Sequence, residues 1–323
     1  MRARVFHNAC TAAALCATLL AARGAHAFCQ ATTCDPTKIS DMCEFDAQNC
    51  LTVGLPLVWQ SNCVTVSVQA DGAPKQNIDY ETALGSVTRA FAAWTGASCD
   101  GGPPAMTVQV SGPITCDASE YNPDKGNANI VVFRQDSWPY VGGQDALGLT
   151  SVHFEAATGT IWDSDIEVNA VDATLSVGDP VPANAVDLDS LLTHEAGHLL
   201  GLAHTTDKSA TMFPGYTEGT STLRHLAQDD IKGICTLYPP GRQASSTSCE
   251  PRHGYSDLCG AQQTSTTSDD PQTTPASTPS SKSCSIARVA TEREGGAFFS
   301  AVLGACLAVT ALARRRVRRA KSA

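Results

Sequence analysis

An eleven-residue stretch with three histidines and one glutamate at fixed spacing constrains the fold more than any other feature. It reads His194-Glu195-Ala-Gly-His198-Leu-Leu-Gly201-Leu-Ala-His204. Residues four apart in a helix project from one face, so His194 and His198 can both bind one metal ion. A glycine can adopt the left-handed conformation that ends a helix. We therefore expect a helix that Gly201 ends, after which the chain turns back and brings His204 to the same ion.

This stretch also predicts the chemistry of the site. Three histidine ligands leave the fourth position of a tetrahedral zinc ion for water, which is typical of catalytic rather than structural zinc. Glu195 adjoins a ligand in sequence and is too close to it to be a ligand itself, so we predict that it is the general base for the attacking water. The alternative interpretation is an ordinary helix with surface histidines. The predicted cofactor is Zn²⁺, with His194, His198 and His204 as its ligands.

The pattern resembles the metzincin metallopeptidases and, within them, the matrixins, here of a bacterial type. Met212 stands eight residues past His204, within Thr211-Met212-Phe213-Pro214-Gly215-Tyr216, a segment similar to the Met-turn of that family. The resemblance implies that Met212 forms an apolar floor beneath the zinc. It also implies that Pro214 and Tyr216 form the wall of the pocket for the substrate residue after the cut.

The other segments predict an α+β domain, with strands first and a late pair of helices. Periodicity predicts strands over 63–68, 106–110 and 129–133, a hairpin of 147–154 with 160–168, and helices over 78–94, 188–200 and 229–238. The resemblance covers 51–240 and implies a metzincin-like catalytic domain. Such a domain has a twisted mixed β-sheet, a long opening helix, an active-site helix and a C-terminal helix. The resemblance further implies that strand 160–168 pairs with the extended substrate.

Two features differ from the animal matrixins. The chain has no Pro-Arg-Cys-Gly-type pro-segment, which leaves the mechanism of latency open. The segment around His153 resembles the histidine-bearing strand of the family's structural zinc site, but the partner histidines are absent. We therefore expect His153 to be an ordinary strand residue. Asp163, Asp165 and Glu167 alternate along one predicted strand and share a face. A calcium (Ca²⁺) site is one interpretation of these carboxylates, and a solvated acidic face is the other.

Both ends of the chain have the pattern of processing signals. Residues 1–27 combine early arginines, an apolar run and a closing Ala-His-Ala, which predicts a secretory signal peptide. Near the other end, 17 uncharged residues (297–313) precede an arginine cluster (314–319). A permanent membrane anchor is one interpretation. A cysteine ahead of such a span resembles the myxobacterial C-terminal sorting tail (MYXO-CTERM), which implies removal by a sorting protease near Cys284.

Composition divides the rest of the chain into segments and excludes one class of partner. Residues 28–283 hold 11 Lys and Arg against 30 Asp and Glu, a net charge of −19, which argues against nucleic acid as a partner. The predicted segments are a signal peptide (1–27), a Cys-rich strap (28–50), the matrixin-like metallopeptidase domain (51–242), a Ser/Thr/Pro-rich stalk (243–283) and a sorting or transmembrane tail (284–323).

The cysteines support an exported protein. Ten remain between the two predicted signals, and an even number in an exported domain predicts disulfides. The spacing leaves the pairing open, although a small loop closed by Cys249 and Cys259 is a reasonable expectation.

Together these features predict an exported, secreted or surface-displayed zinc endopeptidase that acts as a monomer on proteins or peptides. Its contact with the membrane would be through the C-terminal tail. The alternative is a catalytically silent surface adhesion or binding protein that retains the zinc site. The substrate preference cannot be predicted from the sequence, because no motif fixes the shape of the loop around 213–225.

Overall fold

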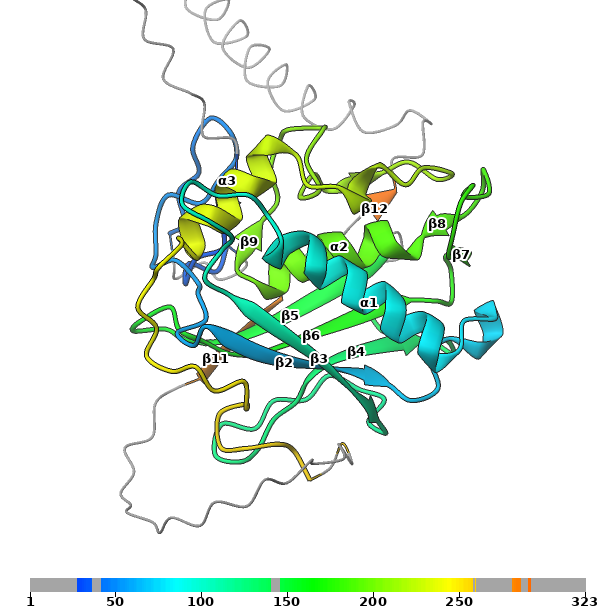
Figure 1. Ribbon diagram of the computed structural model, residues 1–323, viewed down its shortest axis with the longest axis horizontal. Coiled ribbons are helices and arrows are strands. Elements are labelled where there is room, and N and C mark those ends of the chain that lie inside the picture. The colour runs from blue at the N-terminus through cyan, green and yellow to red at the C-terminus, as the bar shows by residue number, and fades with distance from the viewer. Residues whose placement is uncertain are drawn as a thin grey trace, which may run out of the picture.

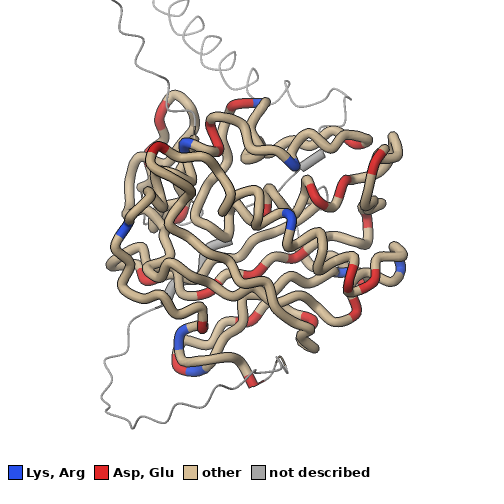
Figure 2. Tube along the Cα trace, in the orientation of Figure 1, with Lys and Arg blue, Asp and Glu red and all other residues tan. Residues whose placement is uncertain are grey.

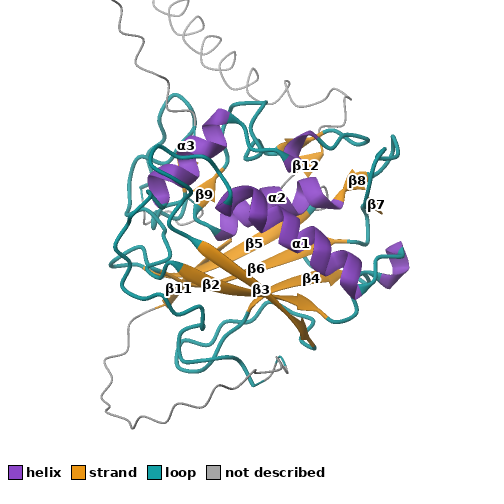
Figure 3. Cartoon of the chain, in the orientation of Figure 1, coloured by secondary structure: helices purple, strands orange, loops and turns teal. Residues whose placement is uncertain are grey.

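The computed structural model describes residues 28–36, 42–140, 146–257, 259, 281–285 and 290–291. A mixed β-sheet forms one layer of this part of the chain, and the helices α1 (Tyr80–Thr95) and α2 (Leu188–Leu199) lie side by side over one of its faces (Figure 1). The third helix, α3 (Gln228–Leu237), follows the loops beyond α2. Figure 3 shows the same separation of helices from strands, which confirms the predicted α+β architecture.

The large sheet has six strands. In spatial order these are β3 (Thr107–Ile114), β2 (Cys63–Gln69), β4 (Asn129–Arg134), β6 (Ile161–Asn169), β5 (Gly148–Glu155) and β11 (Ser281–Ser285). The strands from β3 to β6 pair in parallel, whereas β5 is antiparallel to both β6 and β11. The expectation that strand 160–168 pairs with substrate is therefore wrong, because β4 and β5 occupy both hydrogen-bonding sides of β6. The neighbouring strand β5 likewise has a strand on each side, because β11 pairs with it.

Short strand pairs and two 3₁₀ turns fix the loops around the helices. They are β1 (Cys29–Gln30) with β9 (Leu202–Ala203), β7 (Leu175–Ser176) with β8 (Val186–Asp187), β10 (Gly215–Tyr216) with β12 (Ala290–Thr291), and the turns Pro74–Gln76 and Thr222–Arg224. Because β1 pairs with β9, the N-terminal strap is joined to the segment that directly precedes His204.

The helix α2 is buried along its whole length, so its polar ends need internal partners. At its start, the Asp187 side chain accepts a hydrogen bond from the Ser190 N–H (2.9 Å) and caps the helix. At its end, the Leu199 carbonyl accepts from the Trp59 indole (2.8 Å), and the next carbonyl accepts from the Tyr238 hydroxyl (2.9 Å). Side chains distant in sequence therefore stabilise the helix that carries the predicted metal ligands.

Five disulfides use all ten cysteines that were expected to pair. They are Cys29–Cys50, Cys34–Cys43, Cys63–Cys249, Cys99–Cys235 and Cys116–Cys259. The expected loop between Cys249 and Cys259 is wrong, because Cys249 instead bonds to Cys63 of β2 and Cys259 to Cys116, two residues past the end of β3. Long-range cross-links of this kind restrict the unfolded chain more than a short loop would.

The predicted boundary between domain and stalk at 243 is also wrong. Residues 243–257 lie against the sheet, where the Ser245 N–H donates to the Gln60 carbonyl (3.1 Å) and the Thr65 hydroxyl donates to the Cys249 carbonyl (2.7 Å). Backbone hydrogen bonds and disulfides anchor this polar segment without a large apolar surface. The ordered domain therefore continues at least to Cys259.

The predicted signal peptide and most of the predicted C-terminal tail lie outside the described residues. Among the helices that the structure does describe, none is long and apolar enough to cross a bilayer. Acidic positions outnumber basic ones along the described trace (Figure 2), in line with the negative charge counted from the sequence.

Candidate metal centre and active site

The three histidines of the predicted metal site converge on one point. The Nε2 atom of His194 lies 3.1 Å from Nε2 of His198 and 3.2 Å from Nε2 of His204, and one ligand atom from each residue falls within 4.8 Å of the others. Gly201 has a φ of +97°, as expected for the residue that ends the helix and turns the chain back. A Cβ at Gly201 would lie 2.4 Å from the Leu57 carbonyl oxygen, so close packing also requires glycine there.

The hydrogen bonds of the two helical histidines prepare them to bind a cation. Nδ1 of His194 donates to the Thr211 carbonyl (2.6 Å) and Nδ1 of His198 donates to the Leu202 carbonyl (2.8 Å). Each Nε2 therefore carries a lone pair, and these lone pairs face each other without a proton between them. Burial lowers the pKa of His194 to about 3, which keeps this ring neutral.

The donor set fits zinc. Tetrahedral zinc with Zn–N bonds of ~2.0–2.1 Å holds its nitrogens ~3.3 Å apart, close to the observed separations. Within the described ranges, this is the only group of three or more His, Cys, Asp or Glu residues close enough to share an ion. Calcium binding therefore remains a prediction. The described residues contain no second group of ligands that could hold such an ion.

Glu195 lies between the two helical ligands in sequence and has one free carboxylate oxygen. Its Oε2 atom accepts a hydrogen bond from the Thr150 hydroxyl on β5 (2.6 Å), while Oε1 is buried without a hydrogen-bond partner among the described residues. Burial raises the pKa of Glu195 to about 8, although the bond from Thr150 acts in the opposite direction. A cation held by the neighbouring histidines would favour the charged carboxylate. At Gly148, a Cβ would lie 2.7 Å from Oε1, so the smallest residue makes room for this oxygen.

Met212 lies against α2 between the two helical ligands. A Cβ at Gly197 would be 2.3 Å from the Met212 sulfur, so the methionine fills the space that this glycine leaves. The Asp230 carboxylate accepts hydrogen bonds from the N–H groups of Thr211 (2.7 Å) and Met212 (3.0 Å). Asp230 on α3 thus holds the turn whose Thr211 carbonyl orients His194.

The segment after this turn is fixed to the start of α2. The Tyr216 hydroxyl accepts a hydrogen bond from the Asp187 N–H (2.8 Å) and donates to the Thr220 carbonyl. Arg224 forms an ion pair with the same Asp187 (2.6 Å). Pro214 is half-buried and directly precedes β10. The residues expected to line the substrate pocket are therefore attached to the helix that bears the metal ligands.

Three residues of the site were not found from the sequence: Thr150, Gly148 and Asp230. Each is an ordinary residue type in an ordinary local pattern. Each contacts the site across a long sequence separation, 45 residues for Thr150 and Glu195. Only the pairing of β5 with β6 and the position of α3 bring them to the metal centre.

The acidic residues of β6 are not a solvated face, which corrects that interpretation. Glu167 forms an ion pair with Arg134 (2.8 Å), and Asp165 accepts from the Ile130 N–H (3.0 Å). Asp163 is fully buried, and neither of its carboxylate oxygens has a partner among the described residues. Burial raises the pKa of Asp165 to about 7, and burial with the neighbouring Asp165 raises the pKa of Asp163.

His153 has the surroundings of an ordinary strand residue, as expected. Its ring stacks on Tyr121 with 4.3 Å between the centroids, and burial lowers its pKa to about 4.

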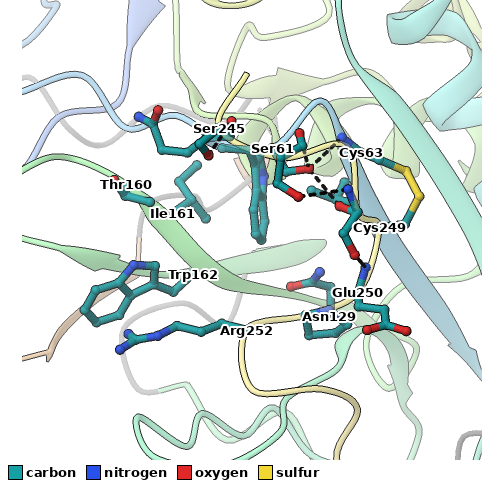
Figure 4. Close-up of a pocket in the computed structure, with 16 residues that line it drawn as sticks. Ser61, Cys63, Asn129, Thr160, Ile161, Trp162, Ser245, Cys249, Glu250 and Arg252 are labelled. Carbon is teal, nitrogen blue, oxygen red and sulfur yellow. Dashed lines mark hydrogen bonds between the residues drawn. A yellow bond between two sulfur atoms is a disulfide. The ribbon is translucent and has the colours of Figure 1, made fainter. Parts of the chain in front are cut away.

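A hollow of about 350 Å³ lies elsewhere, between β2, β6 and the segment 245–252 (Figure 4). The Arg252 guanidinium lies 4.0 Å from the centroid of Trp162 in its wall. None of its lining residues belongs to the three-histidine centre, so we assign the chemistry to the histidine site rather than to this hollow.

These features define a metzincin-like fold with a zinc-type centre. They are a mixed sheet, a helix with two histidine ligands, a third histidine after a glycine turn, and a methionine below them. Comparison with known proteins agrees: residues 105–239, which contain the whole centre, match the family model of the matrixins.

Similar proteins include matrix metalloproteinase-20 of Homo sapiens, which is 31% identical over 183 residues, 56% of this chain and 32% of the relative. Metalloendoproteinase 1 of Glycine max is 30% identical over 191 residues, 56% of this chain and 52% of the relative. Matrilysin of Homo sapiens is 36% identical over 127 residues, 38% of this chain and 43% of the relative. The chain thus spans about a third to a half of the length of these relatives.

Proposed function

We propose that this chain is a zinc-dependent endopeptidase that hydrolyses peptide bonds in proteins or peptides. The observation that carries the proposal is the buried, unpartnered Oε1 of Glu195, the residue that follows His194 on α2, together with the convergence of the three histidines. A buried carboxylate oxygen without a partner is costly, and an active site is one place where such a cost is retained. The names of the relatives, metalloproteinases and metalloendoproteinases, support the same activity.

In the proposed mechanism the side chains of the site transfer one proton, from the attacking water to the leaving amine. Zinc, when bound by the three histidines, lowers the pKa of the attacking water and polarises the substrate carbonyl. Glu195 accepts the proton of that water at Oε1 and delivers it to the nitrogen of the leaving amine. The Thr150 hydroxyl donates a hydrogen bond to the other carboxylate oxygen, which fixes the orientation of the carboxylate. No covalent bond to the protein is needed.

The substrate pocket in this proposal lies beside β10. Met212 forms the floor beneath the metal, and Pro214 and Tyr216 form the wall against the substrate residue after the cut. The bonds of Tyr216 to Asp187 and Thr220 support this role, because they hold the wall in a fixed position relative to α2.

The proposal includes export and action as a monomer outside the cell. The five disulfides support an oxidising compartment. The signal peptide, a C-terminal sorting tail and display at the cell surface remain parts of this proposal that rest on the sequence pattern alone.

Replacement of the proposed base tests the function. Glu195→Ala should bind zinc in a 1:1 ratio, as the wild type does, and lose almost all cleavage of casein and of fluorogenic peptides. Glu44→Ala, which changes an exposed glutamate of the N-terminal strap, is the control and should keep full activity. Robust cleavage by Glu195→Ala would contradict the mechanism. A wild-type chain that binds zinc but cleaves nothing would favour the binding or adhesion protein.

A further inference from the structure

The N-terminal strap is bonded to the short connection that leads from the end of α2 to His204. Its strand β1 pairs antiparallel with β9, and Cys29 lies opposite Ala203. The next pair along the two strands is Gln30 opposite Leu202. In Figure 1 the N-terminal part of the chain, drawn in blue, lies beside β9. The two residues that directly precede the third ligand are therefore paired with the strap.

Gly201, the first residue of this connection, is held by two further backbone contacts. Its carbonyl accepts a hydrogen bond from the Ala31 N–H of the strap (2.9 Å). The Leu57 carbonyl oxygen lies only 2.4 Å from the place where a Cβ of Gly201 would be. The Leu57 N–H in turn donates to the Ala31 carbonyl (2.8 Å), so the two segments that contact Gly201 are bonded to each other. All three residues are buried, so water does not compete for these hydrogen bonds.

This connection acts on two of the three ligands. The Leu202 carbonyl accepts the hydrogen bond from Nδ1 of His198 (2.8 Å), which fixes the nitrogen that faces the ion. His204 follows two residues later and lies outside the helices, so its position depends on the connection itself. The other two ligands lie on α2 and are fixed by that helix. Freedom in the connection would therefore move His204 more than it would move either helical ligand.

A disulfide fastens the strap at this place. Cys29 of β1 is bonded to Cys50, 21 residues further along the chain. The Cys50 N–H donates to the Asp46 carboxylate (2.9 Å), which fixes the second half of the cross-link. A pair of strands as short as β1 and β9 is marginally stable by itself. Because Cys29 is one of the residues paired with β9, the cross-link supports this pairing directly.

A simpler interpretation is that the strap only covers the apolar core. Ala31 and Leu57 do belong to that core, and buried backbone groups need partners wherever they lie. Under this interpretation, loss of the disulfide would lower the stability of the whole domain and leave the release of zinc from the folded domain unchanged. The two interpretations therefore differ in a quantity that can be measured.

We propose that the N-terminal strap, locked by Cys29–Cys50, is a positioning element of the metal centre that keeps His204 on the ion and slows the release of zinc. This inference rests on the proposed function, because it concerns the zinc centre which that function requires. The strap acts through the backbone of residues 201–203 and does not itself contact the ion. A ligand on a tether returns to its ion at an effective concentration that the freedom of the tether sets.

The size of the effect follows from the entropy of the connection. Fixing the backbone of one residue costs a free energy that corresponds to about a tenfold change in an equilibrium constant. Loss of the strap frees a connection of a few residues, of which the contacts with Leu57 and α2 still restrain a part. We therefore expect zinc to leave about tenfold faster when the strap is unlocked.

The test compares two disulfide variants of the full chain, each loaded with one zinc ion. Cys29→Ser/Cys50→Ser unlocks the strap, and Cys116→Ser/Cys259→Ser opens a cross-link beyond the end of β3 as the matched control. The control loop spans 143 residues against 21, so chain entropy predicts that the control loses more overall stability. An excess of a chromogenic chelator should take zinc from the strap variant about tenfold faster than from the wild type. The control should stay within about twofold of the wild type.

Hydrogen exchange of the metal-free chains gives a readout that depends on neither zinc nor activity. The Ala31 amide, which donates to Gly201, should lose protection in the strap variant and keep it in the control. The Thr115 amide, which donates to the Cys259 carbonyl (2.8 Å), should show the reverse pattern. Loss of protection at both amides in both variants would indicate a global effect and contradict a local lock.

Proline variants test the pairing with both disulfides of the strap intact, and they decide the question if the strap variant does not fold. Successive N–H groups of a strand point to opposite sides, so the Ala31 N–H faces β9 and the Gln30 N–H points away from it. Ala31→Pro removes the donor to Gly201 and should also speed the release of zinc about tenfold. Gln30→Pro is the matched control and should stay within about twofold. Equal rates from these two variants would contradict the proposal.

The outcomes separate this inference from the proposed function, because the release of zinc is measured without substrate. Faster release from the strap variant, together with no cleavage by any form, would support the positioning role and overturn the peptidase. Wild-type release from a folded strap variant, together with normal cleavage, would overturn the positioning role and leave the peptidase standing. Equal acceleration in the strap variant and the control would also overturn the positioning role, since a general loss of stability would then account for it.

Discussion

Glu195 on α2 and Asp163 on β6 are both fully buried carboxyl groups, and burial raises the pKa of each. Their surroundings differ. Glu195 has Thr150 on one oxygen and follows His194, one of the three histidines that converge on a candidate cation site. Asp163 has Asp165 as its charged neighbour, and its antiparallel partner in the sheet is His153. A raised pKa is therefore common to a proposed catalytic group and a non-catalytic one, and only the converging ligands distinguish them.

The largest effect should come from isosteric changes at the two carboxyl groups. Glu195→Gln should lower kcat/KM on the order of 10²–10⁴-fold, because an amide cannot accept the proton of the water. Asp163→Asn should leave kcat/KM within about twofold, since it lies outside the site. Steady-state cleavage of one fluorogenic peptide by both variants measures the contrast. Equal losses in the two variants would mean that both act through folding rather than chemistry.

The next effect concerns the turn that returns His204 to the site. Gly201→Ala should lower the free energy of unfolding by roughly 2 kcal/mol or more and weaken zinc binding, because alanine disfavours a φ of +97° and its Cβ would meet the Leu57 carbonyl. Gly178→Ala is the matched control, with a φ of +109° and nothing within 4 Å of its Cβ. Urea unfolding with zinc titration separates them. If the two variants lose equal stability and both keep zinc, the contact with Leu57 has no role.

A smaller effect should follow from loss of the Thr150 hydrogen bond. Thr150→Val should lower kcat about tenfold at constant zinc content, since a hydrogen bond to a carboxylate at the lower end of its usual range, about 1.5 kcal/mol, corresponds to a factor of about ten. Thr150→Ser retains the hydroxyl and should recover most of the activity. A serine variant as slow as the valine variant would show that packing of the methyl group, and not the hydrogen bond, positions Glu195.

The smallest effect is a dependence of stability on pH from Asp163 and Asp165. Their pKa values are raised in the folded chain above 3.8, so between about pH 4 and 7 the folded chain binds more protons than the unfolded chain. Stability from this pair is therefore greatest at low pH and is lost as the pH rises through about 7. Asp163→Asn should flatten this slope, measured as Tm from pH 4.5 to 8. An unchanged slope would show that the pair is not its source.

The features that the sequence predicted correctly are those that depend on residues close together in the chain. The helix α2, its end at Gly201 and the three histidines depend on local periodicity and conformation, and all were predicted. The hairpin of β5 and β6 was predicted for the same reason.

The errors concern long-range pairing. The position of β6 inside the sheet depends on its pairing with β4, which lies elsewhere in the sequence. The burial of Asp165 depends on backbone donors about 35 and 45 residues away, at Ile130 and Glu120. The partners of Cys249 and Cys259 are 186 and 143 residues distant. Alternation along one strand can identify a shared face, but it cannot show what covers that face.

The most direct test of the zinc peptidase is to titrate the metal-free chain with zinc while peptide cleavage is measured. We predict no cleavage without metal, a linear rise with added zinc and a plateau at one zinc per chain. Cleavage by the metal-free chain, or no cleavage at one bound zinc per chain, would contradict it.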